Sequence, residues 1–243
     1  MHRQAENADI YCISNENFHA APVKLKVSDN ACLIDITSGS VMRPSAEDGI
    51  LRFTLESGEM YALTYSDCCL ATEATPTYSH EFILNGHFTV KRTTQFVIDE
   101  LESYNRLIEE APHPAELGDW KDFAGKDFSG SCVYETNFKV PSKTEYALLD
   151  LGDVRYTAEA FLNGRSLGIR VMPPYTYTIQ PEDLCEDNVL RIRVTNTAAN
   201  AYYYTNSFEK WPDWMLTPYY EKTQIFHKDS LFGGLYGPVS VRY

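Results

Sequence analysis

The sequence predicts an all-β protein built of two antiparallel β-sandwiches. Residues 158–162 (A-E-A-F-L) alternate with the period of two that a pleated strand requires. Asn163-Gly164 follows, a dipeptide that tolerates the positive φ values of a type I′ hairpin turn, and Leu167 and Ile169 then resume the alternation. The 17 tyrosines and an aromatic content of 13% also favour sheet over helix.

The first 66 residues contain five short segments with strand character. Turn-forming words rich in Ser, Asn, Asp and Gly separate them, among them 28–30, 37–40 and 57–59. This spacing is typical of a small antiparallel β-sandwich. The five predicted strands are 10–14, 23–27, 32–36, 50–55 and 60–65.

Residues 71–79 are small and polar and contain a proline, which predicts a linker. Strand signals return over 82–98. After Asp99, apolar residues recur at helical spacing behind two glutamates, which predicts a short helix that ends before Pro112.

The remaining strands are predicted at 134–141 and 190–194 (L-R-I-R-V), where the aliphatic residues should be buried. Trp120, with Phe123 and Phe128, is predicted to lie in the core. Residues 198–232 are expected to form a long irregular loop.

The order of words in the second half of the chain resembles a known module. Residues 149–152 read L-D-L-G and are followed by A-x-A-x-L-N-G-x-x-L-G, P-P-Y-x-x-x-I and N-x-L-x-I-x-V-x-N. Gly118-Asp119-Trp120, Phe128-Ser129-Gly130 and the G-G-L-Y-G-P-V of 233–239 also fit. This order is similar to the galactose-binding-like jelly roll of glycoside hydrolase family 2, and still more to the C-terminal module of the family 106 rhamnosidases.

The resemblance implies a small Ig-like β-sandwich over 1–70, a linker over 71–79 and a galactose-binding-like jelly roll over 80–243, with a long aromatic loop at 198–232. Because these modules are the non-catalytic parts of their enzymes, it implies an accessory region that binds or positions an oligo- or polysaccharide. A structural module that docks a catalytic domain or a neighbouring chain is the alternative. A small glycosidase in its own right is a third, although nothing resembles the strand–helix repeat of a catalytic barrel.

The composition limits the classes of molecule that the protein is expected to bind. A net charge of −13 disfavours nucleic acid. No apolar run approaches the ~20 residues of a membrane helix, so a membrane is not an expected partner. The N-terminus lacks the apolar core of a signal peptide. The resemblance suggests an extracytoplasmic or cytoplasmic bacterial glycan-processing protein.

The sequence predicts no catalytic residue and no cofactor. No carboxylate corresponds to a catalytic position of the resembled families, and no H-E-x-x-H, G-x-S-x-G or phosphate-binding glycine loop occurs. The six cysteines contain no C-x-x-C pair. Cys12, Cys32 and Cys132 are interpreted as small buried hydrophobes, and Cys68-Cys69 as either oxidised or reduced.

An aromatic tract between 202 and 220 is the best candidate for a binding surface. Aromatic faces and polar side chains together suit sugar recognition, but the alternatives are that the tract forms part of the core or a lid, or an interface with another domain. The candidate sugar-binding residues are Trp211, Trp214, Tyr203, Tyr219, Asn206 and Asp213.

Two smaller features have structural alternatives. Glu186 and Asp187 lie in an acidic turn that could hold a structural calcium ion, as related jelly rolls do, or could simply be solvated. Asn163, Gly164 and Gly168 are interpreted as structural turn residues. Arg165 and Arg170 flank that turn and could reach a ligand, although exposed hairpin arginines usually do not.

Overall fold

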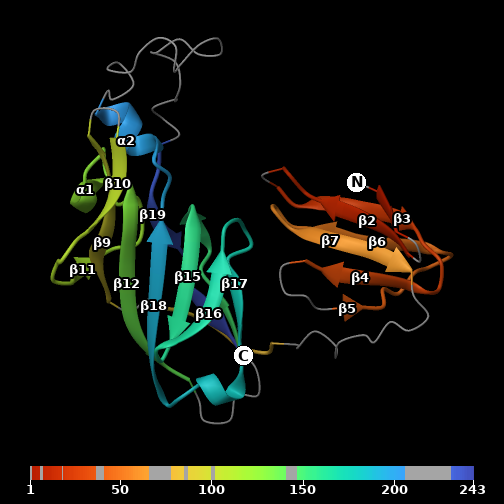
Figure 1. Cartoon of the computed structure of the whole chain (residues 1–243). Coiled ribbons are helices and arrows are strands. Elements are labelled where there is room, and N and C mark those ends of the chain that lie inside the picture. The colour runs from red at the N-terminus through yellow and green to blue at the C-terminus, as the bar shows by residue number, and fades with distance from the viewer. Residues whose placement is uncertain are drawn as a thin grey trace, which may run out of the picture. The chain divides into compact units, whose positions relative to one another are not determined.

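The computed structural model describes residues 2–5, 8–17, 19–36, 41–65, 78–84, 87–99, 102–140, 147–205 and 231–243 (Figure 1). Nearly all of its elements are strands, which confirms the all-β prediction. The chain divides into two compact units, Met1–Thr77 and Tyr78–Tyr243. Among the described residues, no helix is long and apolar enough to span a membrane.

The first unit consists of two antiparallel sheets. Five strands lie in the order β1-β2-β7-β4-β5, and β3 pairs with β6. The five predicted strands are confirmed as β2, β3, β4, β6 and β7, while β1 and β5 were not predicted. The bounds are β1 His2–Ala5, β2 Ala8–Ser14, β3 Ala21–Lys26, β4 Ala31–Asp35, β5 Val41–Met42, β6 Ile50–Leu55 and β7 Met60–Tyr65.

The core of this unit draws on both sheets. Leu33 and Leu63 come from the five-stranded sheet and Leu51 from the two-stranded sheet, and each is at most 4% exposed. Burial of such side chains contributes roughly 1.5–3 kcal/mol each. Cys32 is buried as expected, but it is disulfide-bonded, so its interpretation as a simple buried hydrophobe was wrong.

The second unit has a large sheet and a smaller one facing it. The large sheet runs β10-β9-β12-β18-β15-β16, with β11 also paired to β9 (Figure 1). The smaller sheet runs β17-β13-β20-β8, and β14 pairs with β19. The bounds in the large sheet are β9 Phe88–Asp99, β10 Glu102–Leu107, β11 His113–Ala115, β12 Gly130–Lys139, β15 Thr157–Leu162, β16 Arg165–Arg170 and β18 Asp187–Thr195. The others are β8 Glu81–Ile83, β13 Ala147–Asp150, β14 Asp153–Arg155, β17 Thr176–Ile179, β19 Gly234–Gly237 and β20 Ser240–Arg242.

The inner faces of these sheets form one hydrophobic core. Tyr134 of β12, Leu149 of β13 and Ile192 of β18 are all 0% exposed. Trp120 and Phe128 pack edge to face, with ring centroids 5.4 Å apart, as the sequence predicted for the core. The arrangement is the jelly-roll β-sandwich expected of this part of the chain.

The β15–β16 hairpin has the predicted turn. Asn163 and Gly164 have φ values of 51° and 87°, both in the left-handed region that a type I′ turn requires. Ala158 pairs with Arg170 and Leu162 with Arg165, and Ala158, Ala160 and Leu162 are fully buried.

The prediction of a helix after Asp99 was wrong. Residues 102–107 form β10, paired with β9 from Glu102↔Asp99 to Leu107↔Thr94. All six of its residues are exposed, so there is no buried surface on which an amphipathic helix could pack, and pairing with β9 satisfies the backbone instead. Of the irregular loop expected at 198–232, the structure describes 198–205 and 231–232, and the first part contains the short helix α2 (Ala199–Tyr204). The other helical turns are α1 (Lys121–Ala124) and the 3-10 turn Pro181–Asp183.

Candidate ligand-binding groove

The outer face of the large sheet follows directly from the strand alternation. On β18, Leu190, Ile192 and Val194 are fully buried in the core. Successive side chains of a strand point to opposite faces, so Arg191 and Arg193 project outward, away from the core. β12 behaves in the same way, because Tyr134 is buried and its two neighbours are not.

The register places these outward residues in two neighbouring rows across four strands. The first row joins Thr89 of β9, Glu135 of β12, Arg191 of β18 and Phe161 of β15. The second row joins Lys91, Val133, Arg193 and Glu159 of the same strands. The rows therefore form a polar surface with an aromatic ring in one row and an aliphatic side chain in the other.

A groove of about 590 Å³ lies over these rows. Its size is within the range of about 300–1,000 Å³ that is usual for ligand sites. The lining residues come from four strands, β9, β12, β15 and β18, and from two connections: Thr89, Lys91, Thr93, Pro112, Val133, Glu135, Phe161, Gly164, Arg191 and Arg193.

Ion pairs hold the two arginines in place. Arg191 Nε lies 2.5 Å from Glu135 Oε2, directly across the strand pair. Arg193 Nη1 lies 2.8 Å from Glu159 Oε2, and its guanidinium carbon lies 5.7 Å from the centroid of the Phe161 ring. Exposed pairs of this kind add little stability, about 0–1 kcal/mol each. They do orient the guanidinium groups over the groove.

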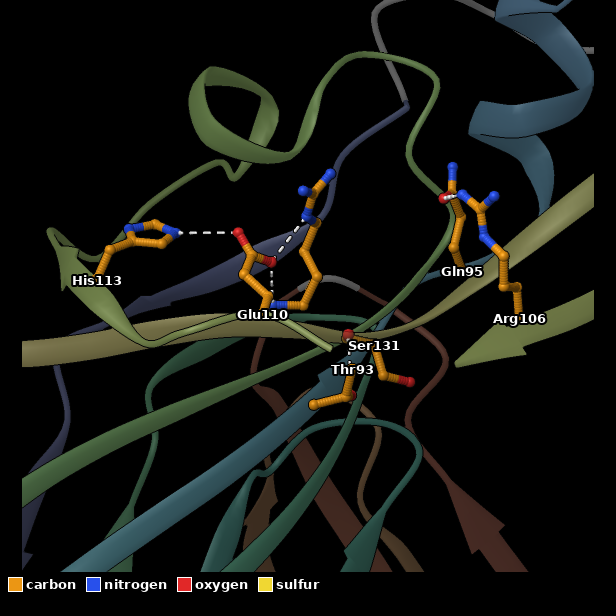
Figure 2. Close-up of polar contacts among 7 residues, drawn as sticks. Thr93, Gln95, Arg106, Glu110, His113 and Ser131 are labelled. Carbon is orange, nitrogen blue, oxygen red and sulfur yellow. Dashed lines mark hydrogen bonds and ion pairs between the residues drawn. The ribbon is translucent and has the colours of Figure 1, made fainter. Parts of the chain in front are cut away.

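One end of the groove is shaped by a β-bulge in β9. The β9–β12 register shifts between Ser131 and Cys132, and Thr93 Oγ1 donates a hydrogen bond to the carbonyl oxygen of Ser131 at 3.1 Å (Figure 2). The carbonyl oxygen of Thr93 accepts a hydrogen bond from the backbone N–H of Ile108 at 2.9 Å. The first bond joins β9 to β12 at the bulge, and the second ties the start of the 108–112 segment, which ends at Pro112 beside the groove, to β9.

Glu110 fixes the same segment from the other side of β9. Its Oε2 accepts hydrogen bonds from the backbone N–H of Arg92 at 3.0 Å and from Arg92 Nε at 2.9 Å, while Oε1 faces His113 Nε2 at 3.9 Å (Figure 2). Burial by itself would raise the pKa of Glu110, but the hydrogen bonds and charge of Arg92 outweigh it, and the net shift is downward. A second pair, Arg106 Nη2 to Gln95 Oε1 at 2.7 Å, ties β10 to β9 (Figure 2).

The groove includes one residue that the sequence singled out. Gly164, interpreted as a turn residue, lines it from the hairpin. Of the candidate sugar-binding residues, only Tyr203 is described: it lies half-buried in α2, with its ring centroid 5.1 Å from that of Tyr204. Trp211, Trp214, Tyr219, Asn206 and Asp213 lie outside the described residues.

The acidic turn before β18 is organised by an asparagine. Asn188 is 1% exposed; its Oδ1 accepts hydrogen bonds from Cys185 N and Asn163 Nδ2, and its Nδ2 donates to Cys185 O. Asp187 pairs with Lys139 at 2.9 Å, and Glu186 is exposed. Among the described residues, no group of three or more His, Cys, Asp or Glu is placed to bind a metal ion.

The two hairpin arginines have structural partners. Arg165 Nη1 lies 2.5 Å from the buried Asp183 carboxylate. Arg170 donates to the Thr176 carbonyl and stacks over Tyr177, 5.0 Å from the ring centroid. Neither arginine lines the groove.

Sequence reasoning missed Lys91, Glu135, Arg191 and Arg193. A signal was present, because the alternation that predicts the buried face of 190–194 also directs Arg191 and Arg193 to the opposite face. The alternation does not predict that β18 pairs with β12 and β15, and this pairing brings together residues that are far apart in the sequence.

No family model and no curated protein matches this sequence. Among solved structures, this chain is similar to the rhamnosidase from Novosphingobium sp. PP1Y. The match covers 100% of this chain and 23% of the rhamnosidase chain, at 23% sequence identity and a TM-score of 0.64. This chain has the fold of that segment. The match to the β-glucuronidase of an uncultured Clostridium sp. covers 71% of this chain and 30% of the glucuronidase chain, at 18% sequence identity and a TM-score of 0.43. The match to the GH2 β-galacturonidase from Eisenbergiella tayi covers 70% of this chain and 25% of the galacturonidase chain, at 15% sequence identity and a TM-score of 0.41.

The similar structures are thus glycoside hydrolases, and the chain corresponds to only part of each. It spans between 23% and 30% of the length of these three proteins. Over its full length, the chain has the fold of one segment of the Novosphingobium rhamnosidase.

Proposed function

We propose that this chain is a non-catalytic, carbohydrate-binding region of a glycoside hydrolase-like protein, which holds or positions a saccharide near a catalytic domain. The chain corresponds over its full length to about a quarter of a rhamnosidase, and this supports an accessory role. Fold alone does not give function, so the proposal depends mainly on the groove.

The observation that carries the proposal is the combination of groups that line the groove. The ring of Phe161 offers a flat apolar face, Thr89 and Thr93 offer hydroxyl groups, and Arg191 and Arg193 offer hydrogen-bond donors. Sugars present both C–H faces and hydroxyl groups, so they suit such a surface. An open site of this kind implies weak affinity, on the order of millimolar to tens of micromolar.

The groove suits recognition better than glycoside hydrolysis. Hydrolysis usually requires two carboxyl groups about 5–10 Å apart. Among the described residues that line the groove, Glu135 is the one carboxylate, and it is paired with Arg191.

Calorimetric titration against a panel of neutral and acidic oligosaccharides tests the proposal, with rhamnose-containing glycans included. We expect binding to at least one glycan, weakened by Phe161→Ala and unchanged by Ile169→Ala, a matched exposed residue outside the groove. Trp211→Ala and Trp214→Ala test the aromatic tract separately. If no glycan binds, or if the chain releases nitrophenol from aryl glycosides, the proposal is wrong.

A second candidate function is docking of a catalytic domain or a neighbouring chain. It is favoured by three exposed apolar residues at the end of β16, Ile169, Val171 and Met172, which are 55%, 65% and 49% exposed. Light scattering of the chain mixed with a separately produced catalytic domain tests it. A complex that Val171→Asp disrupts is expected; two independent species at all concentrations would contradict it.

We also propose an oxidising, extracytoplasmic location. The support is the disulfide of Cys32, since disulfides persist mainly in such compartments. Thiol counting on protein isolated from its native cells under non-reducing conditions checks this, because a fully reduced protein would contradict it.

A further inference from the structure

We infer that the groove binds an acidic saccharide, with the carboxylate or sulfate of the sugar held over Val133 between Lys91 and Arg193. This inference rests on the proposed function and adds the class of sugar. It follows from the sign of the charges in the groove and from their positions in the second row.

The charge of the groove is opposite to that of the whole chain. The chain has a net charge of −13, with 34 acidic residues against 21 lysines and arginines. The groove is lined by three cations, Lys91, Arg191 and Arg193, and one carboxylate, Glu135. With Glu159, which pairs with Arg193, counted beside Glu135, the two rows still carry one net positive charge. A locally positive surface on an acidic protein favours an anionic ligand at this place.

The register places a small apolar residue between two cations. Val133 is the partner of Lys91 on one side and of Arg193 on the other. Neighbouring strands are about 4.8 Å apart, so the backbones of Lys91 and Arg193 are separated by about 10 Å. Their long side chains can therefore both reach an anion located above the short Val133 side chain.

The existing ion pairs leave donors for such an anion. Arg193 uses Nη1 for Glu159, and a guanidinium group carries five N–H donors, so further donors remain. Lys91 forms no ion pair with any described residue. Pairing with Glu159 and the contact with Phe161 hold the Arg193 guanidinium toward β15, so the anion takes the N–H donors on the edge that faces away from Glu159.

The first row supplies a place for the sugar ring. Phe161 is the partner of Arg191 and lies diagonally from Arg193, whose guanidinium contacts its ring. Phe161 and Val133 are two strands apart, about 10 Å, so a disaccharide can place one ring over Phe161 and the acidic group of the other over Val133. A neutral sugar can use Phe161 alone, whereas an acidic sugar uses both parts of the groove.

Calorimetric titration at low salt tests this inference with three related probes: digalacturonic acid, its methyl ester, which lacks the charge, and a sulfated disaccharide. We expect at least one acidic probe to bind at least about tenfold more tightly than the methyl ester. The preference should decrease with added salt. Whichever acidic probe binds more tightly identifies the anion, and either result supports the inference.

Two variants and one control connect the preference for the acidic probe to the groove. Lys91→Met should remove most of it, while Lys126→Met, an exposed lysine outside the groove, should leave it intact. Val133→Glu places a carboxylate in the anion position, so it should abolish the preference and retain binding of the methyl ester. Unchanged melting temperatures verify that each variant folds.

The outcomes separate this inference from the proposed function. Equal binding of the acidic probe and its methyl ester, unaffected by Lys91→Met, would overturn the inference and leave carbohydrate binding intact. Binding of polyglutamate as tight as that of the acidic sugar, with the same sensitivity to Lys91→Met, would also overturn it, since the groove would then bind acidic peptides. Absence of binding to any saccharide would overturn both.

Discussion

Glu110 accepts two hydrogen bonds from Arg92 on a single carboxylate oxygen, one from the backbone N–H and one from the guanidinium Nε, at 3.0 and 2.9 Å. The backbone N–H is available because the bulge interrupts the regular β9–β12 ladder beside it. The pair closes the bulge and positions the segment that ends at Pro112, so it links the local irregularity of β9 to the shape of the groove.

Glu110→Gln should lower the free energy of unfolding by about 1 kcal/mol at neutral pH, because the amide retains an acceptor but loses the charge that strengthens both bonds. Glu109→Gln, at the exposed neighbouring residue, should change it by less than about 0.5 kcal/mol. Urea unfolding measures both variants, and equal effects would contradict the role of Glu110.

The contribution of Glu110 should depend on pH. Because its pKa in the folded protein lies below the ordinary value of 4.5, the charged carboxylate stabilises the fold above that value. The stability is lost as the pH falls through the folded pKa. The difference between wild type and Glu110→Gln should therefore be constant near neutrality and shrink in acid. A difference that grows in acid would contradict the assignment.

Ionisation of Tyr175 should lower the free energy of unfolding at high pH. Burial, assisted by the nearby Asp153, raises its pKa from 10.0 to about 12, and its hydroxyl donates to the carbonyl oxygen of Tyr156. Its neutral form is thus favoured in the fold, so its contribution is complete below pH 10 and declines as the pH rises toward 12. Tyr175→Phe should reduce that decline and Tyr104→Phe, on exposed β10, should not. Spectrophotometric titration of tyrosinate in the folded protein would contradict this if Tyr175 ionised at its ordinary pKa.

Two glycines should respond differently to substitution. Gly164 has a φ of 87° and open space around it, so Gly164→Val should cost about 1 kcal/mol or more from backbone conformation alone. A Cβ at Gly130 would lie 2.1 Å from the Thr94 carbonyl oxygen and 2.9 Å from Gln95 Cα, so Gly130→Ala should cost more, roughly 2–4 kcal/mol. Thermal unfolding ranks the two, and the reverse order would contradict the close packing of β12 on β9.

The hydrogen bonds of the Asn188 side chain should stabilise the acidic turn without a bound metal ion. Asn188→Ala removes three hydrogen bonds of a buried amide and should destabilise by about 1–3 kcal/mol, whereas Asn137→Ala, at an exposed position of β12, should have little effect. A chelator should leave the melting temperature of the wild type unchanged. A large decrease would show that a metal ion stabilises this turn after all.

Local patterns were sufficient for several strands and for the hairpin, but not for β1, β5 or β10. Period-two alternation and Asn163-Gly164 act over a few residues, so the sequence alone predicts β15, β16 and the buried face of β18. The prediction at 102–107 failed because apolar spacing there competes with pairing to β9, and tertiary pairing overrides weak helix propensity.

The candidate site was less predictable than the fold. Lys91, Val133 and Arg193 form one row only because β9, β12 and β18 are neighbours, and their separation in the sequence hides that register. Phe161 was visible as part of an alternating strand but gave no sign of its cationic neighbours. The aromatic tract, by contrast, attracts notice by composition alone, and most of it lies outside the described residues.

The most direct test of the account is a map of amide chemical-shift changes during titration with digalacturonic acid. The account predicts that the largest changes fall on β9, β12, β15 and β18 around Lys91, Val133, Phe161 and Arg193. Changes confined to 202–220, or no changes at any concentration reached, would contradict it.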